Sequence, residues 1–329
     1  MKIFDAFLKG LRNLNRSKRY IFLVYLISLL ATLILGAALS STLQSAIGSS
    51  LAGENLLKGF DDMWYSSFSS QVKGLAKTFE PGVVGIGAVF KGLDAFLRGS
   101  FLKNYPGIVG VGLLYLLLWT FFSAGFISIY SAPDERPAFF QQAAKFFSRF
   151  LILGVFAGIL YYLVLHFVLN WLNNTVNELT RETIDERIHF TYTVIKYLIV
   201  WILVWTVNVL FDYSKIYTVI KDHKNALTAP FKALVVVFRN FSKTYGLYFT
   251  IGAVWVVLML LYWLIAPGAN QAAWTTILGA FLLGQLYIIF RIGTRCFFYA
   301  GQTAMCAALT SDVVVGAKHS EQESVSNTN

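Results

Sequence analysis

Charged residues are scarce in this chain of 329 residues. Asp, Glu, Lys and Arg together make up 13% of it, whereas a soluble globular domain is usually about one quarter charged. Apolar residues make up 57%, and the mean hydropathy is +0.61. This balance excludes an ordinary soluble domain and predicts an integral membrane protein.

Cysteine and histidine are also few. The chain has two cysteines, Cys296 and Cys306, and four histidines. The cysteines form neither a disulfide framework nor a Cys-x-x-Cys knuckle, and the histidines lack metal-ligand spacing. We therefore expect no metal site and no cofactor, and we expect the cysteines to pack as small apolar side chains.

The motifs of membrane-embedded catalysis are missing as well. The sequence has no His-Glu-x-x-His, no Gly-x-Ser-x-Gly and no pair of carboxylates within an apolar run. Such patterns supply the metal, the nucleophile or the acid–base pair that catalysis needs. The adjacent Asp61 and Asp62 are interpreted as a solvated turn. The sequence therefore favours a protein that is not an enzyme.

Two glycine-rich stretches are nearly identical, PGVVGIG at 81–87 and PGIVGVG at 106–112. A phosphate-binding glycine loop follows a buried strand and opens a helix, but the second copy leads directly into the apolar run LLYLLLWTFFSAGF. Small residues three or four positions apart let membrane helices approach closely. We expect the second copy to open a membrane span and the first to open a short interfacial or re-entrant helix.

Long apolar runs are abundant. About 20 mostly apolar residues are needed to cross roughly 30 Å of hydrocarbon, and runs of that length recur six times. We predict an all-α polytopic membrane protein in which six transmembrane helices form three hairpins. The predicted spans are 20–42, 107–130, 149–170, 193–212, 246–267 and 275–298.

The positions of Lys and Arg predict the orientation, because short segments rich in these residues stay in the cytoplasm. The leader carries six of them and the segment 212–245 carries six more, whereas 173–189 is net acidic and 267–273 has no charge. Both termini are therefore expected on the cytoplasmic side of the membrane. We attribute the net charge of +10 to this topology and to anionic lipid headgroups, and we expect no nucleic-acid partner.

Three segments share one pattern, in which an amphipathic stretch with a basic or polar end leads into a span. Such stretches form helices at the headgroup boundary, so each hairpin is expected to follow an amphipathic interfacial helix. Pro137 and Pro230 stand where two of these helices should begin. The alternative is that polytopic proteins in general have basic, aromatic-rich segments beside their spans. The three segments are 4–27, 137–160 and 230–254.

The chain divides into a cytoplasmic basic leader at 1–19, a membrane domain at 20–310 and a cytoplasmic polar tail at 311–329. Within the membrane domain, 43–106 is a long extracytoplasmic loop. Its segment VFKGLDAFLRGSFLKNY has an apolar stripe at helical spacing, so this loop is expected to lie on the outer leaflet or to dip into it. The tail is expected to be disordered at its end.

Ionisable residues near the inner ends of the spans are the candidates for function, because charge is costly in hydrocarbon. Arg291 and Arg295 lie four positions apart and share one helix face, and Asp212 ends the fourth span at a similar depth. We predict an ion pair between Asp212 and one of the two arginines. The arginines either bind a lipid phosphate or another anion, or extend to the headgroups beside a purely structural pair.

The basic residues of the third amphipathic segment are the predicted contacts to anionic lipid. Lys232, Arg239 and Lys243 lie in or beside the run PFKALVVVFRNFSKTY. A Lys or Arg near an anionic leaflet contributes about 1 kcal/mol. These three residues, together with Arg291 and Arg295, form the predicted lipid- or anion-binding set.

The runs 207–250 and 284–302 resemble a group of bacterial multi-pass proteins. The group includes the membrane domain attached to some glycerophosphoryl diester phosphodiesterases. The similarity lies in a span that ends near an acidic residue, the polar turn KDHKNA, an amphipathic helix and another hairpin. The resemblance implies this architecture and a bacterial inner membrane. It implies no catalytic residue, since the phosphodiesterase domain is missing.

The leading functional hypothesis is a non-enzymatic protein of the inner membrane. It would organise the membrane or act as an accessory subunit, binding anionic lipid and either a protein partner or a second copy of itself. The alternative is a transporter or translocator of a lipid or small amphiphile, because repeated hairpins can create a site at mid-membrane. A cavity lined by Asn208, Gln285 and Arg291 would favour this alternative.

Overall fold

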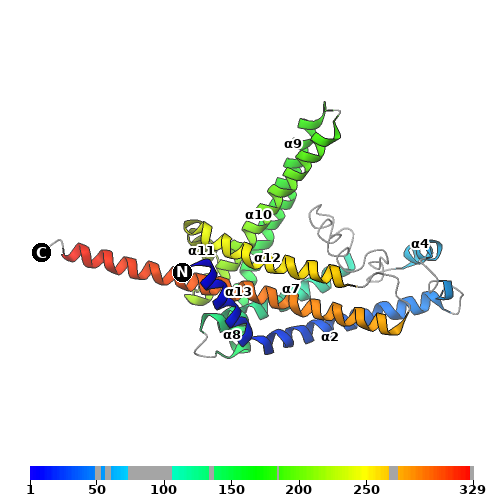
Figure 1. The fold of residues 1–329 in the computed structure, drawn as a ribbon, viewed down its shortest axis with the longest axis horizontal. Coiled ribbons are helices and arrows are strands. Elements are labelled where there is room, and N and C mark those ends of the chain that lie inside the picture. Colours follow the sequence, from blue (N-terminus) through cyan, green and yellow to red (C-terminus); the bar gives the residue numbers. More distant parts are fainter. Residues whose placement is uncertain are drawn as a thin grey trace. The chain divides into compact units, whose positions relative to one another are not determined.

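The computed structural model describes residues 1–48, 53–55, 61–72, 106–132, 137–183, 185–266 and 273–326. All regular structure in these ranges is helical (Figure 1), which confirms the predicted all-α class for this part of the chain. Five of the helical segments are long and apolar enough to cross a membrane. The first glycine-rich stretch, 81–87, and the amphipathic segment 89–105 lie outside the described residues.

The helices follow the predicted spans closely. Each predicted span falls on a helix, and the five segments long enough to cross a membrane correspond to the second to sixth predicted spans. The first predicted span falls on α2, for which membrane crossing stays a prediction. In chain order the helices are α1 (Ile3–Arg16), α2 (Lys18–Ile47), α4 (Asp62–Gln71), α7 (Pro106–Ser131), α8 (Phe139–Tyr162), α9 (Leu169–Thr180), α10 (Glu186–Ile220), α11 (Ala229–Arg239), α12 (Phe241–Ile265) and α13 (Trp274–Ser326).

Prolines mark the beginnings of three helices. Pro106 is the first residue of α7, so the second glycine-rich stretch does open the second predicted span. Pro230 lies in the first turn of α11, and Pro137 stands two residues before α8, which begins at Phe139. Proline suits these places because the first turn of a helix leaves its N–H groups without intrahelical partners.

The chain folds as two compact units. The first comprises Met1–Lys18, Leu117–Trp255 and Gly293–Asn329, and the second comprises Arg19–Leu116 and Val256–Ile292. All three predicted amphipathic segments begin in the first unit. In the second unit the hydroxyl of Tyr25 donates a hydrogen bond to Oε1 of Gln285 over 3.1 Å, which links α2 to α13.

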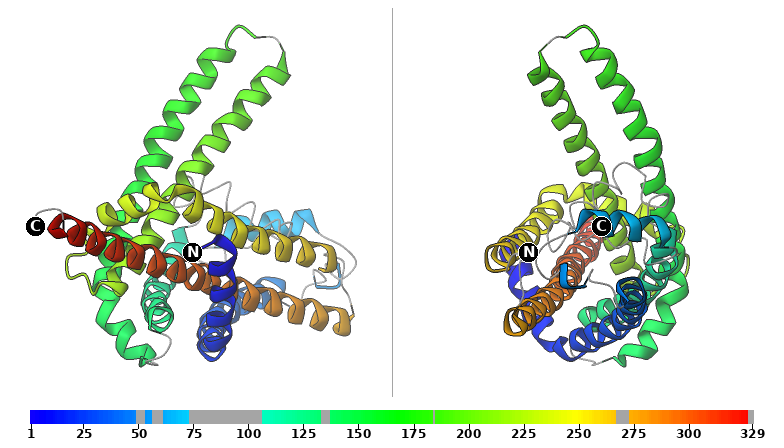
Figure 2. Two further views of the ribbon diagram at one scale, coloured as in Figure 1. Left: turned by 60° about the vertical axis from the view of Figure 1, so that its left-hand side comes forward. Right: turned by 90° about the vertical axis from the view of Figure 1, so that its right-hand side faces the viewer.

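In the first unit, α1 is docked onto α12 and α13. Its buried residue Ala6 packs with Leu247 and Ile251 of α12 and with Phe297 of α13. At Gly10 the backbone of α1 lies directly against the backbone of α13. A Cβ placed at Gly10 would lie only 2.8 Å from a backbone atom of α13. Figure 2 shows α1, in dark blue beside the N-terminus, crossing α13. The leader is therefore part of the packed unit.

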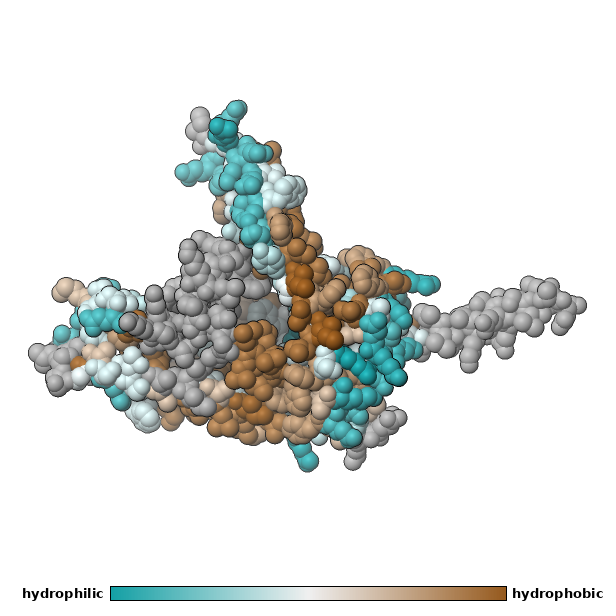
Figure 3. Space-filling view, turned by 180° about the vertical axis from the view of Figure 1, so that it is seen from behind, coloured by the Kyte–Doolittle hydropathy of each residue, from teal (hydrophilic) through white to brown (hydrophobic). Residues whose placement is uncertain are grey.

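A long helical hairpin forms another part of the first unit. The 42 residues Phe139–Thr180 form one continuous helical rod, in which Leu163–Val168 is a π-helical turn. This rod runs beside α10 (Figures 1 and 2). At about 1.5 Å per residue, the 35 residues of α10 extend roughly 50 Å and exceed the hydrocarbon thickness of about 30 Å. Figure 3 shows a hydrophilic tip above a hydrophobic shaft.

The structure departs from the sequence prediction at two helix ends. No break separates the second amphipathic stretch from its span, because α8 continues through Ser148 with Phe146 and Phe150 buried on either side. The predicted polar tail is also helical, since α13 extends to Ser326. Residues 311–326 contain several good helix formers and no proline, so no local signal ends the helix at the membrane boundary.

Candidate functional site

The predicted ion pair forms between α10 and α13. Nη2 of Arg295 lies 3.0 Å from Oδ1 of Asp212, and the side chain of Asp212 is 2% exposed, whereas that of Arg295 is 31% exposed. Arg291, one turn earlier on α13, is exposed and belongs to the second unit. Of the two arginines that the sequence offers, Arg295 is the one in contact with the carboxylate.

Aromatic side chains surround this ion pair. The guanidinium carbon of Arg295 lies 4.9 Å from the centroid of the Tyr299 ring, within the range of a cation–π contact. The Tyr299 hydroxyl in turn accepts a hydrogen bond of 3.3 Å from the indole N–H of Trp119 on α7. The Asp212–Arg295 pair therefore links α10 to α13, and the Trp119–Tyr299 hydrogen bond links α7 to α13.

Several buried polar side-chain atoms of α10 and α13 have no hydrogen-bond partner among the described residues. They are Oδ2 of Asp212, the hydroxyls of Tyr213 and Thr303, and both amide atoms of Gln302. Tyr213 and Gln302 are fully buried. Since buried polar groups are nearly always paired with protein or water, this seam of α10 and α13 has unused hydrogen-bonding capacity.

The other three residues of the predicted lipid- or anion-binding set lie on α11 and α12. Lys232 and Arg239 of α11 and Lys243 of α12 are all exposed, and no hydrogen bond or ion pair within the described ranges joins them to Arg295. Next to them α11 exposes Phe231, whose side chain is 65% exposed, and a set of further apolar residues. The exposed apolar residues of this helix are Phe231, Leu234, Val235 and Phe238.

Burial divides α11 into three faces. With successive residues about 100° apart around the axis, the buried residues Ala229, Ala233 and Val237 form one side. The exposed apolar residues are centred roughly 150° further round, and Lys232 and Arg239 lie between them and the buried side. One helix therefore presents a protein-packing face, an exposed apolar face and a basic face.

The other two amphipathic segments show the same three faces. In α1, Ala6 and Gly10 are buried, Phe4, Leu8 and Leu11 are exposed, and the basic residues lie on the third side. The first turns of α8 repeat the arrangement. Two orders of the three faces are possible around a helix, and all three segments have the same one. In α8 the buried face is Phe139, Ala143, Phe146 and Phe150, the exposed apolar face contains Phe140 and Leu151, and the basic face is Lys145 and Arg149.

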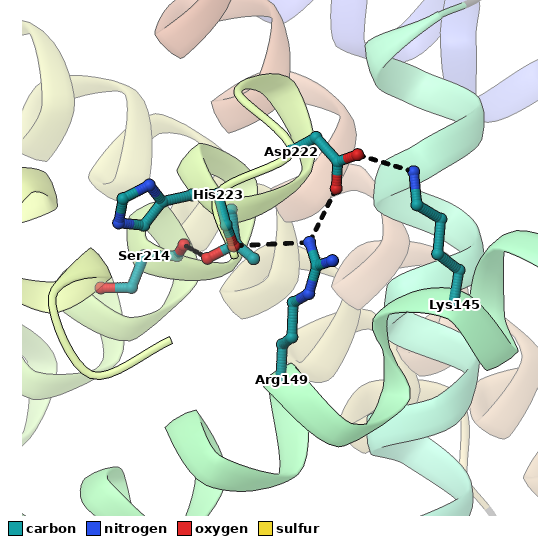
Figure 4. A network of polar contacts seen from close by, with 6 residues as sticks. Lys145, Arg149, Ser214, Asp222 and His223 are labelled. Atoms are coloured by element: carbon teal, nitrogen blue, oxygen red, sulfur yellow. Dashed lines mark hydrogen bonds and ion pairs between the residues drawn. The ribbon is translucent and has the colours of Figure 1, made fainter. Parts of the chain in front are cut away.

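Among the described residues, the basic residues of α8 are the ones in these three segments that form ion pairs, and their partner is Asp222. Its Oδ2 accepts a hydrogen bond of 2.9 Å from Nζ of Lys145, and its Oδ1 accepts one of 2.7 Å from Nη1 of Arg149. Figure 4 shows the carboxylate between the two cations. These hydrogen bonds, first that of Lys145 and then that of Arg149, lower the pKa of Asp222 below its ordinary value. We call these three residues the Asp222 clamp.

The Asp222 clamp was not predicted from the sequence, although the sequence contains two signals of it. Lys145 and Arg149 lie four positions apart, so they share a helix face. Asp222 is the only acidic residue between positions 213 and 245, a stretch that otherwise carries six basic residues. What the sequence lacked was any indication that the turn after α10 folds back onto α8.

The remaining candidate groups for chemistry are buried or isolated. Cys296 and Cys306 are free and buried, as small apolar residues would be. In the part of the chain that the structure describes, no three His, Cys, Asp or Glu side chains lie together as metal ligands do. Asp61, interpreted from the sequence as part of a solvated turn, caps α4 by accepting a hydrogen bond of 3.0 Å from the Trp64 N–H.

Comparison of the chain with protein-family models, with curated proteins and with solved structures returns no match. The features that bear on function are therefore the two polar clusters and the three-faced helices.

Proposed function

We propose that this chain is a non-enzymatic protein of a bacterial inner membrane, which organises the membrane or serves as an accessory subunit. In this proposal α2 is a sixth span, the helices form three hairpins, and both termini are cytoplasmic. The basic faces of α1 and α11 bind anionic headgroups, and a protein partner or a second copy of the chain associates with it. The resemblance of 207–250 and 284–302 to bacterial multi-pass proteins supports the bacterial setting.

The observation that carries this proposal is the three-faced form of α1 and α11. A helix at the membrane boundary needs an apolar side toward the acyl chains and a basic side toward the headgroups. A helix that also packs against protein needs a third side. In both helices the exposed apolar residues adjoin exposed Lys and Arg, so the arrangement suits a helix held at an anionic leaflet by a packed unit.

Spin labels can test whether α11 lies in the leaflet. The full chain, with Cys296 and Cys306 replaced by Ala, would carry a single label at position 231 or 232 in lipid nanodiscs. We expect the label at 231 to collide with oxygen, which partitions into lipid, and the label at 232 to collide with a water-soluble nickel chelate. On α1, a label at position 8 should likewise collide with oxygen and a label at position 9 with the nickel chelate. Equal access of the nickel chelate to 231 and 232 would contradict the proposal.

The headgroup preference is tested with charge variants of the full chain. The double variant Lys232→Gln with Arg239→Gln should bind anionic lipid in nanodiscs more weakly than the parent protein does. The loss should be about 1 kcal/mol of binding free energy for each positive charge removed. Arg181→Gln with Arg187→Gln removes the same charge from the polar tip of the hairpin and serves as the control. Equal losses in the two double variants would mean that net charge, and not the α11 face, determines the preference.

The alternative function, transport or translocation of a lipid or small amphiphile, is supported by a different observation. Asp212, Tyr213, Gln302 and Thr303 bury polar atoms that have no partner among the described residues, and such a seam could hold a polar ligand or ordered water. Native mass spectrometry of protein extracted gently from its own membrane separates the two functions. A stoichiometric partner subunit supports the accessory role, whereas one retained class of amphiphile without a partner supports translocation.

A further inference from the structure

Asp222 ends α10 in a conformation that normally belongs to glycine. Its φ is +41°, and it is the only described non-glycine residue with a positive φ. The N–H of His223 donates to the carbonyl of Thr218 over 2.9 Å, and the N–H of Asp222 donates to the carbonyl of Val219 over 3.2 Å. These two hydrogen bonds define a Schellman motif, in which the position occupied by Asp222 is usually Gly and sometimes Asn.

Local physical chemistry disfavours an aspartate at this position. A residue with a Cβ is strained in the left-handed region, although Asp and Asn are tolerated better than most residues. A carboxylate at the C-terminus of a helix also lies at the negative end of the helix dipole. Glycine would avoid both costs. A residue that contradicts its local preferences points to a function for its side chain.

The carboxylate of Asp222 is held by the cations of α8. Besides its hydrogen bond to Asp222, Arg149 contacts the carbonyl oxygen of His223, with Nη1 3.4 Å away. Both cations are also positioned by a buried aromatic ring, since Nζ of Lys145 and Cζ of Arg149 lie 4.9 Å and 5.1 Å from the centroid of Phe146. Lys145 and Arg149 therefore converge on one point through contacts of their own.

The position where the carboxylate of Asp222 lies between Lys145 and Arg149 is accessible to ligands. The side chains of Lys145 and Asp222 are 45% and 53% exposed, and Lys221 and Lys224 next to Asp222 are exposed as well. The clamp brings two positive charges to one negative charge, so its net charge is positive and attracts anions. An Arg and a Lys that approach two oxygens of one anionic group provide the donor arrangement that also binds phosphate.

We propose that Lys145 and Arg149 form a binding site for the phosphate group of an anionic lipid, which Asp222 closes as an internal counter-ion. This inference rests on the proposed function, because it assigns a headgroup site to the α8 segment. A lipid phosphodiester carries one negative charge and replaces the carboxylate without changing the charge of the site. Displacement frees Asp222 and the turn 221–228 that leads into α11.

Substitutions of Asp222 test this proposal in the full chain. Asp222→Asn keeps the size of the side chain and its tolerance of a positive φ but removes the competing charge. Asp222→Gly also removes the backbone strain, so it should stay folded even if the asparagine variant does not. We expect both variants to bind phosphatidylglycerol roughly two- to tenfold more tightly than the parent protein in a native mass spectrometry titration, because one or two exposed ion pairs no longer compete. Phosphatidylcholine binding should not change.

Two controls distinguish a local site from a general effect of charge. Glu178→Gln changes the net charge equally at the far tip of the hairpin and should leave lipid binding unchanged. Lys145→Gln with Arg149→Gln, combined with Asp222→Asn, should abolish the gain. The proposal is overturned if Asp222→Asn and Asp222→Gly bind anionic lipid no more tightly, or if the gain persists without Lys145 and Arg149.

A competition arm identifies the source of the phosphate. Inorganic phosphate should displace the lipid only weakly, because it lacks acyl chains for the exposed apolar residue Ile152, which lies three positions after Arg149 on the same side of α8. Displacement by inorganic phosphate at concentrations similar to the lipid would overturn the assignment to a headgroup. Loss of anionic preference in the α11 double variant reports on the proposed function separately, so the failure of one proposal can be told from the failure of the other.

Discussion

The absence of a side chain at Gly10 allows α1 to dock. A Cβ at this position would lie 2.8 Å from Cα and 2.9 Å from N of Gly301, and backbone atoms of a packed helix cannot move aside. Gly10→Ala should therefore lower the free energy of unfolding by about 1–3 kcal/mol through overpacking. Because Cys296 and Cys306 are buried, a thiol-reactive fluorophore can follow the thermal unfolding.

Gly154→Ala is the matched control for this prediction. It makes the same chemical change within α8, where an added Cβ would have no neighbour within 4 Å. There alanine should leave the stability unchanged or raise it by up to about 1 kcal/mol, since glycine is a poorer helix former. If Gly10→Ala proved as harmless as Gly154→Ala, the close packing of α1 on α13 would be incorrect.

The charge of Asp222 predicts how the clamp responds to pH. The hydrogen bonds from Lys145 and Arg149 hold its pKa below the ordinary value of 3.8. A carboxyl whose pKa is lowered in the folded protein contributes stability that is present above the unfolded pKa and lost as the pH falls through the folded pKa. The clamp is therefore intact at neutral pH and weakens only in acid.

Thermal unfolding of the parent protein and of Asp222→Asn, followed by tryptophan fluorescence, measures this contribution. The difference in Tm should stay constant from about pH 5 to pH 8, far above an ordinary carboxyl pKa, and shrink once the pH falls below that of a free aspartate. A difference in Tm that disappeared well above the ordinary pKa of an aspartate would show that the charge of Asp222 is not its cause.

At the scale of elements, the Asp212–Arg295 pair couples α10 to α13. Asp212 is 2% exposed, so Arg295→Met would leave a buried charge without its partner and should destabilise the protein by about 3–5 kcal/mol. Replacing both residues by apolar ones, Asp212→Leu with Arg295→Met, should recover most of that loss because no buried charge remains. The fluorophore assay on the single and double variants provides the double-mutant cycle, and additive losses would show that the two residues do not interact.

Element boundaries show how local and tertiary effects compete. The breaks after α1 and α11 fall at Ser17 and Asn240, residues whose short polar side chains compete with helical hydrogen bonding. Ser148 has a similar short polar side chain, yet α8 continues through it because Phe146 and Phe150, two positions before and after Ser148, are buried. The sequence pattern was the same in all three segments, and only the packing separated the second from the others.

At the scale of the whole molecule, the number of spans decides where the termini lie. With six spans the N- and C-termini share one side of the membrane, whereas five spans would place them on opposite sides. Single cysteines at Lys2 and Lys224, in a chain with Cys296 and Cys306 replaced by Ala, should be shielded from a membrane-impermeant maleimide in intact cells. A cysteine at Arg181 should react. Labelling at Lys2 but not at Lys224 would mean that α2 does not cross.

The sequence by itself determined the helical class and the positions of the long apolar helices, because the length and composition of an apolar run depend on local residues alone. It also limited the partner of Asp212 to Arg291 or Arg295, since few charges lie near the span ends and a buried charge requires one of opposite sign. These inferences needed no knowledge of which helices are neighbours.

Only the tertiary structure decided which basic residues have acidic partners and which helix faces are buried. Asp222 and Lys145 are separated by 77 positions, and only the fold of the turn after α10 brings them into contact. The contact of Gly10 with Gly301 is equally remote in sequence. Both depend on the crossing of helices, which is set by side-chain packing over the whole unit and leaves no local pattern in the residues that make the contact.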